Sequence, residues 1–487
     1  MKRRVVLGAL AALIIAVLAG AAVWWWIAVG AQPSYDPVSA TTPLSGWKAP
    51  WAADAVPDPG APPKRWIVVG WDGADWKYAL PLLDAGKLPN LAALMRDGAY
   101  GEMRSFKPTW SPVLWTTVAT GVDPGRHGIL AWGRAAKDRP RERRLFTNAD
   151  RRVHAIWNLL TDRRRPSLVV GYHNTYPAER VEGLMVSNYL YHEHLEATMD
   201  ASEPGRASGS GLVFPPERLR EVLDIQHAVG LSLPGAVSRF ASFGAADADA
   251  FTAPLHRELR PGDDRRIFFL KKAYLFDEFD GRVALEEYPR VQPDLMLVHF
   301  QCIDLAGHYF LYFRDPKAFA SMPWTAEQRA SLDAQMPLYQ GTMDAFYEFA
   351  DEWLGRLRAL AGPDTGILLL SDHGFEPEPN PERTGYHVSA PPGIFVVAGP
   401  GVRRGLAQPA TLYDVFPTLA STLSLPLAED LRGRPRSDWF TERSWHGVTI
   451  ARVAGYDPDG RYVPDLPAPD DSENELLEQL RAIGYVD

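Results

Sequence analysis

Short, uninterrupted apolar runs recur along the chain between longer segments in which apolar residues return at helical spacing. The strand-like runs lie at 66–70, 167–171, 184–187, 294–300, 367–370 and 394–398. Helical patterns fall between several of them, for example at 89–95 and 331–360. Apolar strands that alternate with helices are typical of a mainly parallel sheet covered on both faces. We therefore expect an α/β protein whose functional site lies beyond the carboxyl ends of its strands.

The chain begins with a basic segment, Met1–Arg4, followed by an uncharged apolar stretch from Val5 to Ala31. As a helix rising about 1.5 Å per residue, this stretch can cross a bilayer core of about 30 Å. The basic start favours the cytoplasmic side, and the tryptophans at 24–26 suit the membrane interface. We expect residues 1–31 to form an uncleaved signal anchor, a transmembrane helix. The alternatives are a cleaved signal peptide and a buried helix.

With an anchor or a signal peptide, the rest of the chain lies outside the cytoplasm. The single cysteine, Cys302, excludes an intramolecular disulfide framework. We expect the periplasmic side of a bacterial inner membrane, or the periplasm itself after signal cleavage. Residues 32–63 are rich in Pro and Ala and are interpreted as an extended linker. Residues 64–487 are then one folded domain, with a cap insertion within about 131–290, where most of the irregular sequence lies.

Composition excludes several classes of protein. A hydrophobic fraction of 46% and a charged fraction of 23% exclude general disorder. The net charge of −9 argues against binding of a nucleic-acid duplex, which favours a basic excess. The basic cluster at 134–144 is either a solvated loop or a contact for anionic headgroups or a phosphorylated substrate. One cysteine also excludes cysteine-based zinc motifs, so a bound metal must be held by histidines and carboxylates.

Carboxylates and histidines lie next to several predicted strands, most of them at the strand ends. They are Asp72, Asp304, His308, Asp372, His373 and His387. Asp304 and His308 are four residues apart and share one face of a helical turn. Taken singly, such residues are more often turn residues, surface ion pairs or structural histidines. Because several follow strands of one sheet, they can converge, and together they have the ligand inventory of two divalent ions.

Ser111 precedes Pro112 and opens a predicted helix. A serine at this position is often an N-cap. The alternative is functional, because the dipole and free N–H groups of a helix N-terminus favour an oxyanion and a phosphate. A serine between two divalent ions would suit an in-line displacement at phosphorus.

The candidate ligands and Ser111, in their order along the chain, resemble those of the alkaline phosphatase superfamily. Within it, the resemblance is to the type I phosphodiesterase/nucleotide pyrophosphatase group. The likeness covers about 65–435. It runs through Gly70-Trp-Asp-Gly73, Ser111-Pro-Val-Leu-Trp-Thr116, Ala119-Thr-Gly121, His127-Gly-Ile129, Gln301-Cys-Ile-Asp304, Ser371-Asp-His-Gly-Phe375, Gly399-Pro-Gly401 and Asp414-Val-Phe-Pro-Thr418.

The resemblance implies an alkaline phosphatase-like three-layer α/β/α sandwich with an inserted cap. It also implies two zinc ions with three protein ligands each: Asp304, His308 and His387 for one, and Asp72, Asp372 and His373 for the other. Ser111 would contact both ions and act as the nucleophile, so that a phosphoseryl enzyme forms and is then hydrolysed by water. The likeness makes His127 a structural residue, and we leave it out of the metal site.

Two positions depart from the resemblance. Related nucleotide pyrophosphatases usually have a threonine nucleophile and, three residues later, an asparagine that binds a phosphoryl oxygen. Here these positions are Ser111 and Leu114, so a backbone N–H or another residue, such as Asn174, must bind that oxygen. Sulfatases require an arginine where this chain has Trp115, which argues against a sulfatase.

We expect a membrane-tethered, extracytoplasmic hydrolase of phosphate esters, with phosphodiesters favoured as substrates. The substrate class is a phosphate-ester small molecule or a lipid or glycan headgroup. The alternatives are a phosphomonoesterase or a phospho-group transferase of the same fold, and a catalytically silent binding module.

Overall fold

The computed structural model describes residues 43–51, 60–135, 143–190, 211–242, 264–457 and 462–466. The predicted signal anchor, residues 1–31, lies outside the described residues, as do most of the linker and part of the basic cluster. No helix within the described ranges is both long and apolar enough to cross a bilayer. The predictions of an anchor and of an extracytoplasmic location therefore stay predictions.

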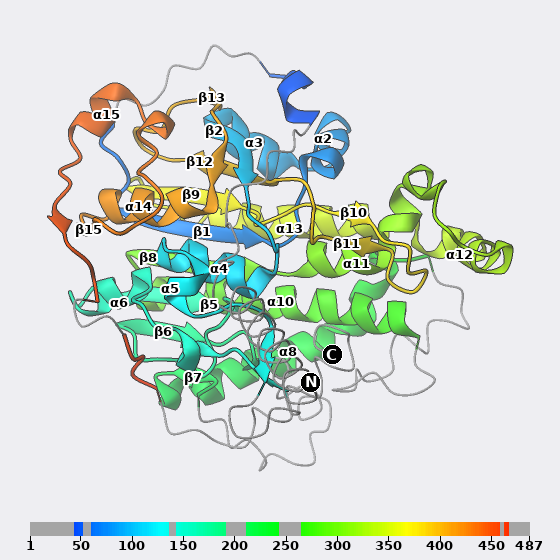
Figure 1. Cartoon of the computed structure of the whole chain (residues 1–487), viewed down its shortest axis with the longest axis horizontal. Coiled ribbons are helices and arrows are strands. Elements are labelled where there is room, and N and C mark those ends of the chain that lie inside the picture. Colours follow the sequence, from blue (N-terminus) through cyan, green and yellow to red (C-terminus); the bar gives the residue numbers. More distant parts are fainter. Residues whose placement is uncertain are drawn as a thin grey trace, which may run out of the picture. The chain divides into compact units, whose positions relative to one another are not determined.

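One large sheet forms the centre of the described part of the chain (Figure 1). Its strand order is β13 (Gly405–Leu406), β2 (Gly98–Arg104), β12 (Gly393–Ala398), β9 (Thr365–Leu370), β1 (Arg65–Trp71), β8 (Leu295–Phe300), β5 (Ser167–Val170), β6 (Gly183–Val186) and β7 (Val213–Phe214), with β14 (Ala410–Thr411) beside β2. Three two-stranded pairs lie outside it: β3 (Gly133–Ala135) with β4 (Arg143–Leu145), β10 (Glu376–Pro377) with β11 (Gly385–Tyr386), and β15 (Leu427–Ala428) with β16 (Arg452–Val453).

The middle of the sheet is parallel. Strands β9, β1, β8, β5 and β6 all run in one direction, and Val69 of β1 pairs with Val298 on one side and Leu369 on the other. These strands are almost entirely buried, as their continuous apolar sequences require. Only β12 and β7 run antiparallel to their neighbours among the strands of this sheet that the structure describes. The predicted mainly parallel α/β sheet is confirmed.

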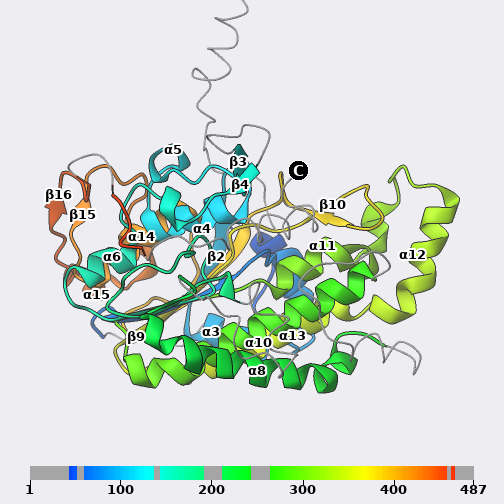
Figure 2. The ribbon, with the colours of Figure 1, turned by 90° about the horizontal axis from the view of Figure 1, so that it is seen from below.

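Helices cover both faces of the sheet, which gives three layers (Figure 2). One face carries α2 (Trp76–Asp84), α3 (Pro89–Asp97), α8 (Leu219–Ala236), α10 (Arg265–Val291), α11 (Cys302–Arg314) and α13 (Thr342–Arg358). The other carries α4 (Ser111–Thr120), α5 (Pro124–His127), α6 (Ile156–Thr161) and α14 (Leu412–Thr422). The remaining α-helices are α12 (Ala326–Tyr339) and α15 (Glu442–His446), and short 3-10 helices occur at Pro43–Gly46, Asn148–Asp150, Pro216–Arg218, Val237–Arg239, Pro316–Phe319 and Ser437–Trp439.

Three sequence predictions need adjustment. Strand β2 was not expected, because two glycines and Glu102 interrupt its apolar pattern; it forms by pairing with β12. The helix expected at 331–360 is two helices, α12 and α13, separated at Gly341. Much of the region proposed to hold a cap belongs to the main body, because β5, β6 and β7 extend the central sheet. A cap elsewhere within 131–290 stays a prediction.

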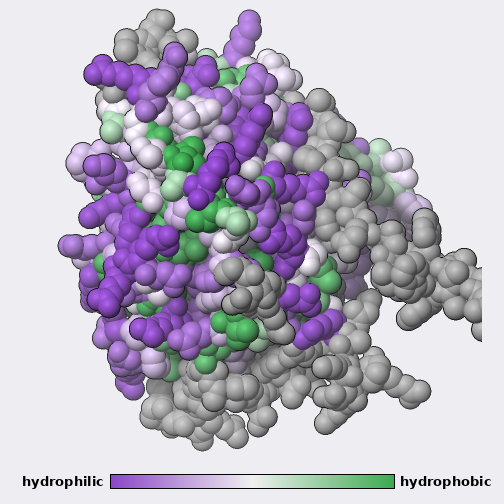
Figure 3. Space-filling view, turned by 60° about the vertical axis from the view of Figure 1, so that its left-hand side comes forward, coloured by the Kyte–Doolittle hydropathy of each residue, from purple (hydrophilic) through white to green (hydrophobic). Residues whose placement is uncertain are grey.

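The apolar side chains are concentrated between the layers. The largest fully buried side chains include Trp66, Trp71 and Trp76, which come from β1 and the start of α2. The described part of the face in Figure 3 is mostly hydrophilic, with small hydrophobic patches between the polar residues. Among the described residues, few large hydrophobic side chains are strongly exposed; Leu231 and Val463 are two of them. The close packing between the layers fixes the positions of the strand ends.

Candidate metal centre and active site

The predicted ligands meet at the carboxyl ends of three adjacent strands. Asp72 follows β1, Asp372 and His373 follow β9, and Asp304 and His308 lie on α11, which begins directly after β8. All five side chains are buried. The sheet order β9-β1-β8 therefore brings together residues that are far apart in the sequence, as the predicted parallel sheet requires.

The first group consists of Asp304, His308 and His387. On α11, Asp304 Oδ2 lies 3.6 Å from His308 Nε2, and Asp304 Oδ1 lies 3.9 Å from His387 Nε2. His387 comes directly after β11, and the β10–β11 hairpin lies beside α11 (Figure 1). One ligand atom from each residue lies within 4.8 Å of the others, close enough for one ion.

The second group consists of Asp72, Asp372 and His373. His373 Nε2 lies 3.3 Å from Asp72 Oδ1 and 3.5 Å from Asp372 Oδ2. The two groups are neighbours, because the His373 and His387 rings stack with their centroids 4.0 Å apart. Gly73 has a positive φ of 75°, and a Cβ there would lie 3.0 Å from the Cα of Asp304, so only glycine allows this approach.

Backbone carbonyls orient the three histidines of these groups. His308 Nδ1 lies 2.9 Å from the carbonyl oxygen of Gly385, and His373 Nδ1 lies 3.1 Å from that of Gly374. His387 Nδ1 lies 2.7 Å from the carbonyl oxygen of Thr109. A carbonyl can only accept, so each Nδ1 carries the hydrogen and donates it. Each Nε2 then presents a lone pair to the carboxylates, which is the usual arrangement of metal-binding histidines.

The buried carboxylates and the shifted pKa values of the site also favour the binding of cations. Burial, together with the negative charges of Asp72 and Asp304, raises the pKa of Asp372 well above its ordinary value. Both Asp372 carboxylate oxygens are buried without a hydrogen-bonding partner among the described residues. Burial lowers the pKa of His308 to about 3, so its imidazole is neutral. Buried carboxylates beside neutral imidazoles are the donor set of a borderline divalent ion such as zinc.

Ser111 is the first residue of α4, and its hydroxyl does not cap the helix. Trp110 is the N-cap residue, and no side-chain cap hydrogen bond is formed. Ser111 Oγ instead lies 3.3 Å from Asp72 Oδ1 and 3.4 Å from His373 Nε2. The serine therefore faces the second group of ligands, as expected for a nucleophile, and the alternative of a simple N-cap is wrong.

The structure gives Asn174 a role other than the predicted phosphoryl contact. Its Nδ2 donates to the carbonyl oxygen of Pro112, at 2.8 Å, and to Thr116 Oγ1, at 2.9 Å. Both amide hydrogens are thus committed to α4, and none is left for a phosphoryl oxygen. Asn174 holds the first turn of the helix that carries Ser111, so the substrate-binding assignment is corrected.

His127 lies outside both ligand groups. The Thr117 hydroxyl donates to the carbonyl oxygen of Val113, so His127 Nε2 donates to Thr117 Oγ1 at 3.1 Å. His127 Nδ1 accepts from the Ile129 N–H at 3.2 Å. Both ring nitrogens of the neutral imidazole are satisfied, which agrees with leaving His127 out of the metal site.

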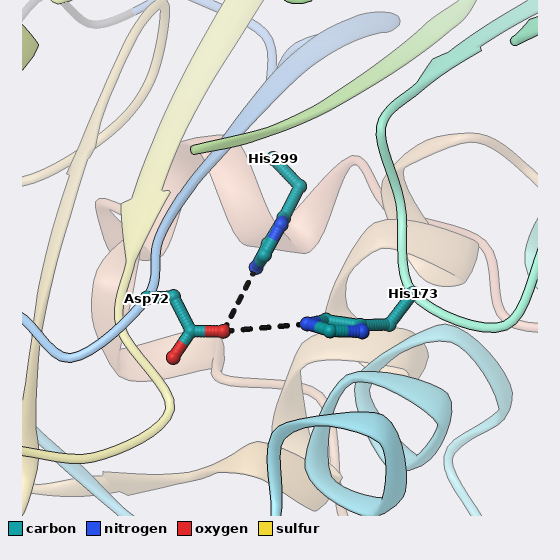
Figure 4. Close-up of side chains that lie close together, drawn as sticks. All are labelled: Asp72, His173 and His299. Atoms are coloured by element: carbon teal, nitrogen blue, oxygen red, sulfur yellow. Dashed lines mark hydrogen bonds and ion pairs between the residues drawn. The ribbon is translucent and has the colours of Figure 1, made fainter. Parts of the chain in front are cut away.

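Two histidines near Asp72 were missed in the sequence. His299 lies within β8 and His173 follows β5, and both rings face Asp72 (Figure 4). His299 is part of an apolar strand pattern, and His173 stands in an irregular segment, so neither had the Asp-His spacing that marked the other ligands. The one signal was their position near the ends of predicted strands.

The comparisons with known proteins agree with this geometry. The family model of type I phosphodiesterase / nucleotide pyrophosphatase matches residues 66–391, more than half of the chain. The chain belongs to this family. The protein is therefore a hydrolase of phosphoric esters, from a family of metal-dependent phosphoesterases, and the resemblance seen in the sequence is confirmed.

Solved structures with some similarity include a phosphonoacetate hydrolase from Sinorhizobium meliloti 1021 in complex with phosphonoformate. It is 16% identical, with a TM-score of 0.35, over 71% of this chain and 61% of that chain. A mutant of the alkaline phosphatase PafA is 11% identical, with a TM-score of 0.47, over 80% of this chain and all of that chain. No curated protein matches the sequence significantly.

His127 makes a testable contribution to stability. Burial lowers its pKa from 6.5 to about 3, so between these pH values the unfolded chain binds a proton that the folded chain excludes. Stability that is complete above pH 6.5 is therefore lost as the pH falls towards 3. In a His127→Gln variant, the dependence of the unfolding free energy on pH near pH 5 should be shallower by about 1.4 kcal/mol per pH unit. Urea unfolding of both metal-free proteins, in which the other histidines contribute equally, measures this; equal slopes would contradict it.

Proposed function

We propose that this protein hydrolyses phosphodiesters at a centre of two zinc ions, with Ser111 as the nucleophile. The observation that supports this most directly is the position of the Ser111 hydroxyl. It lies at the first residue of α4, and its oxygen is 3.3 Å from Asp72 Oδ1 and 3.4 Å from His373 Nε2. A hydroxyl that only stabilised the helix would bond to backbone N–H groups instead.

The two ligand groups would each hold one ion. Asp304, His308 and His387 are the candidates for one, and Asp72, Asp372 and His373 for the other. When bound, the ions supply positive charge that lowers the pKa of the serine hydroxyl and compensates charge on the phosphoryl oxygens. The three backbone carbonyls that fix the histidine rings keep the Nε2 lone pairs aimed at the centre.

The chain's own groups then carry the reaction in two steps. Ser111 Oγ attacks phosphorus, an ester P–O bond breaks, and the alcohol leaves with a proton. Water next attacks the phosphoserine, the P–Oγ bond breaks, and Ser111 regains its proton. The backbone N–H of Ser111 is at the first position of α4, where a helical N–H has no intrahelical partner, and is our candidate for binding a phosphoryl oxygen in place of a side chain at Leu114.

We further propose that residues 1–31 anchor the protein in the bacterial inner membrane, with the catalytic domain in the periplasm. The support is the uncharged stretch from Val5 to Ala31 after a basic start. The full-length protein should remain in the membrane pellet after an alkaline carbonate wash and be digested by protease added to spheroplasts. A protein lacking residues 1–31 should be in the soluble fraction. Full-length protein that is soluble, or that is protected in intact spheroplasts, would refute the anchor or the periplasmic location, respectively.

Substrate preference and nucleophile are tested together. Zinc-loaded enzyme should hydrolyse bis-p-nitrophenyl phosphate faster than p-nitrophenyl phosphate. Ser111→Ala should lower the rate by at least about 100-fold without a loss of bound metal, because the oxygen that attacks phosphorus is missing. Ser421→Ala is the matched control: this buried hydroxyl donates to the Pro417 carbonyl in α14, away from the candidate centre, and its loss should leave the rate unchanged. A faster monoester would make the enzyme a phosphatase, and transfer to an added alcohol in preference to water would make it a transferase.

Removal of the metal should abolish activity and destabilise the site. After treatment with EDTA, activity should vanish and return with zinc, and the melting temperature should fall, because buried carboxylates lose their cations. Asp372→Asn should lower the zinc content by one ion per chain. Activity that persists in protein shown to be metal-free would contradict the proposal.

A further inference from the structure

Two histidines face Asp72 on the side of its carboxylate away from Ser111. Asp72 follows β1, His299 lies in β8, and His173 follows β5, so the three residues come from three adjacent strands (Figure 4). Their relative exposures are 1, 0 and 5%, which places the cluster in the interior. Ser111 contacts Asp72 through Oδ1, whereas both histidines face Oδ2.

The spacing within this cluster is that of ligands around an ion. Asp72 Oδ2 lies 3.2 Å from His299 Nε2 and 3.5 Å from His173 Nε2, and the three atoms lie within 4.8 Å of one another. The His299 contact is a long hydrogen bond, because charge-assisted hydrogen bonds to a carboxylate are usually about 2.7–2.9 Å. Two ligands of a tetrahedral zinc ion with bonds of about 2.0–2.1 Å lie about 3.3 Å apart. The second group of the candidate centre has the same spacing, 3.3 and 3.5 Å.

Hydrogen bonds satisfy the His299 ring only in part. Its Nε2 makes one long hydrogen bond, 3.2 Å, to Asp72 Oδ2, and its Nδ1 is buried without a hydrogen-bonding partner in the described part of the chain. An ion held by Nε2 and Asp72 would replace the long contact with a stronger one and offset part of the cost of burying the ring.

Packing holds the two rings in place. The Trp115 indole meets the His299 ring edge to face, with centroids 4.6 Å apart, and Trp132 meets His173 in the same manner at 5.6 Å. A Cβ at Gly70 would lie 2.7 Å from the Trp115 ring and 3.0 Å from the His299 ring, so glycine makes this arrangement possible. Trp115 Nε1 donates to Asp72 Oδ2 at 3.0 Å, which leaves the second lone pair of that oxygen for an ion.

We propose that Asp72, His173 and His299 form a third metal site, for a borderline divalent ion such as zinc. Two imidazoles and one carboxylate select such an ion over magnesium or calcium, which prefer oxygen ligands. Asp72 would bridge this ion, through Oδ2, to the neighbouring centre, through Oδ1. The inference rests on the proposed two-ion centre only in sharing Asp72.

Metal content tests the site directly. Protein loaded with zinc and freed of excess by dialysis should contain three zinc ions per chain by elemental analysis. His173→Asn and His299→Asn should each lower the content to two, because asparagine can still donate a hydrogen bond to Asp72 but is a poor zinc ligand. His127→Asn is the matched control: this buried histidine lies outside all three ligand groups, and the variant should retain three. Anomalous scattering at the zinc edge from crystals should show a peak next to Asp72 Oδ2 that is absent in His299→Asn.

The outcomes separate this inference from the proposed function. Two zinc ions in the wild type, unchanged by His173→Asn and His299→Asn but lowered by Asp304→Asn, would overturn the third site and leave the two-ion centre standing. The histidines would then only hold Asp72 in position. A wild type without bound zinc would overturn both. Three ions, one of them lost in each histidine variant, would establish the site.

Discussion

Three carboxylates buried side by side impose the constraint on which the rest of this structure depends. Asp72, Asp304 and Asp372 all lie within reach of His373 Nε2. Like charges removed from water repel strongly. Burial and this repulsion together raise the pKa of Asp372. Cations, or a proton on one of the carboxyl groups, stabilise such a cluster within a framework that keeps it from relaxing. The histidines, the glycine at 73 and the buried parallel strands all serve that arrangement.

The parallel sheet holds the three carboxylates close together. Each of the three carboxylates emerges at the end of a different strand, and the strands are neighbours. Their apolar side chains are buried between helices on both faces, so the strand ends are held at fixed spacing. The proposed nucleophile, Ser111, lies on the other face of the sheet at the start of α4, and Asn174 donates two hydrogen bonds to that helix. The buried strands thus position the candidate site, and the residues that follow them or begin α4 supply its functional groups.

Residues with a clear local pattern were predictable from the sequence, and residues defined by tertiary context were not. The buried strands and the ligands at their ends stood out because apolar runs ended abruptly at Asp or His. Strand β2 did not, because its glycines and Glu102 hide a strand that exists only through its neighbour β12. Asn174 was named as one possible replacement for the asparagine missing at position 114, and the sequence cannot show that its amide is already occupied. His173 and His299 are ordinary residues in the sequence and gain meaning only from the distances to Asp72.

The ligands of the candidate centre are spread from Asp72 to His387. Neither of the two ligand groups lies within one short stretch of the chain, so each is complete only after folding has brought its distant members together. The last histidine is synthesised only after most of the chain, and its ring is oriented by a carbonyl from residue 109. An ion held by all three residues of a group would therefore be bound by the largely folded chain. The ions available where folding is completed would then decide which metal occupies the centre.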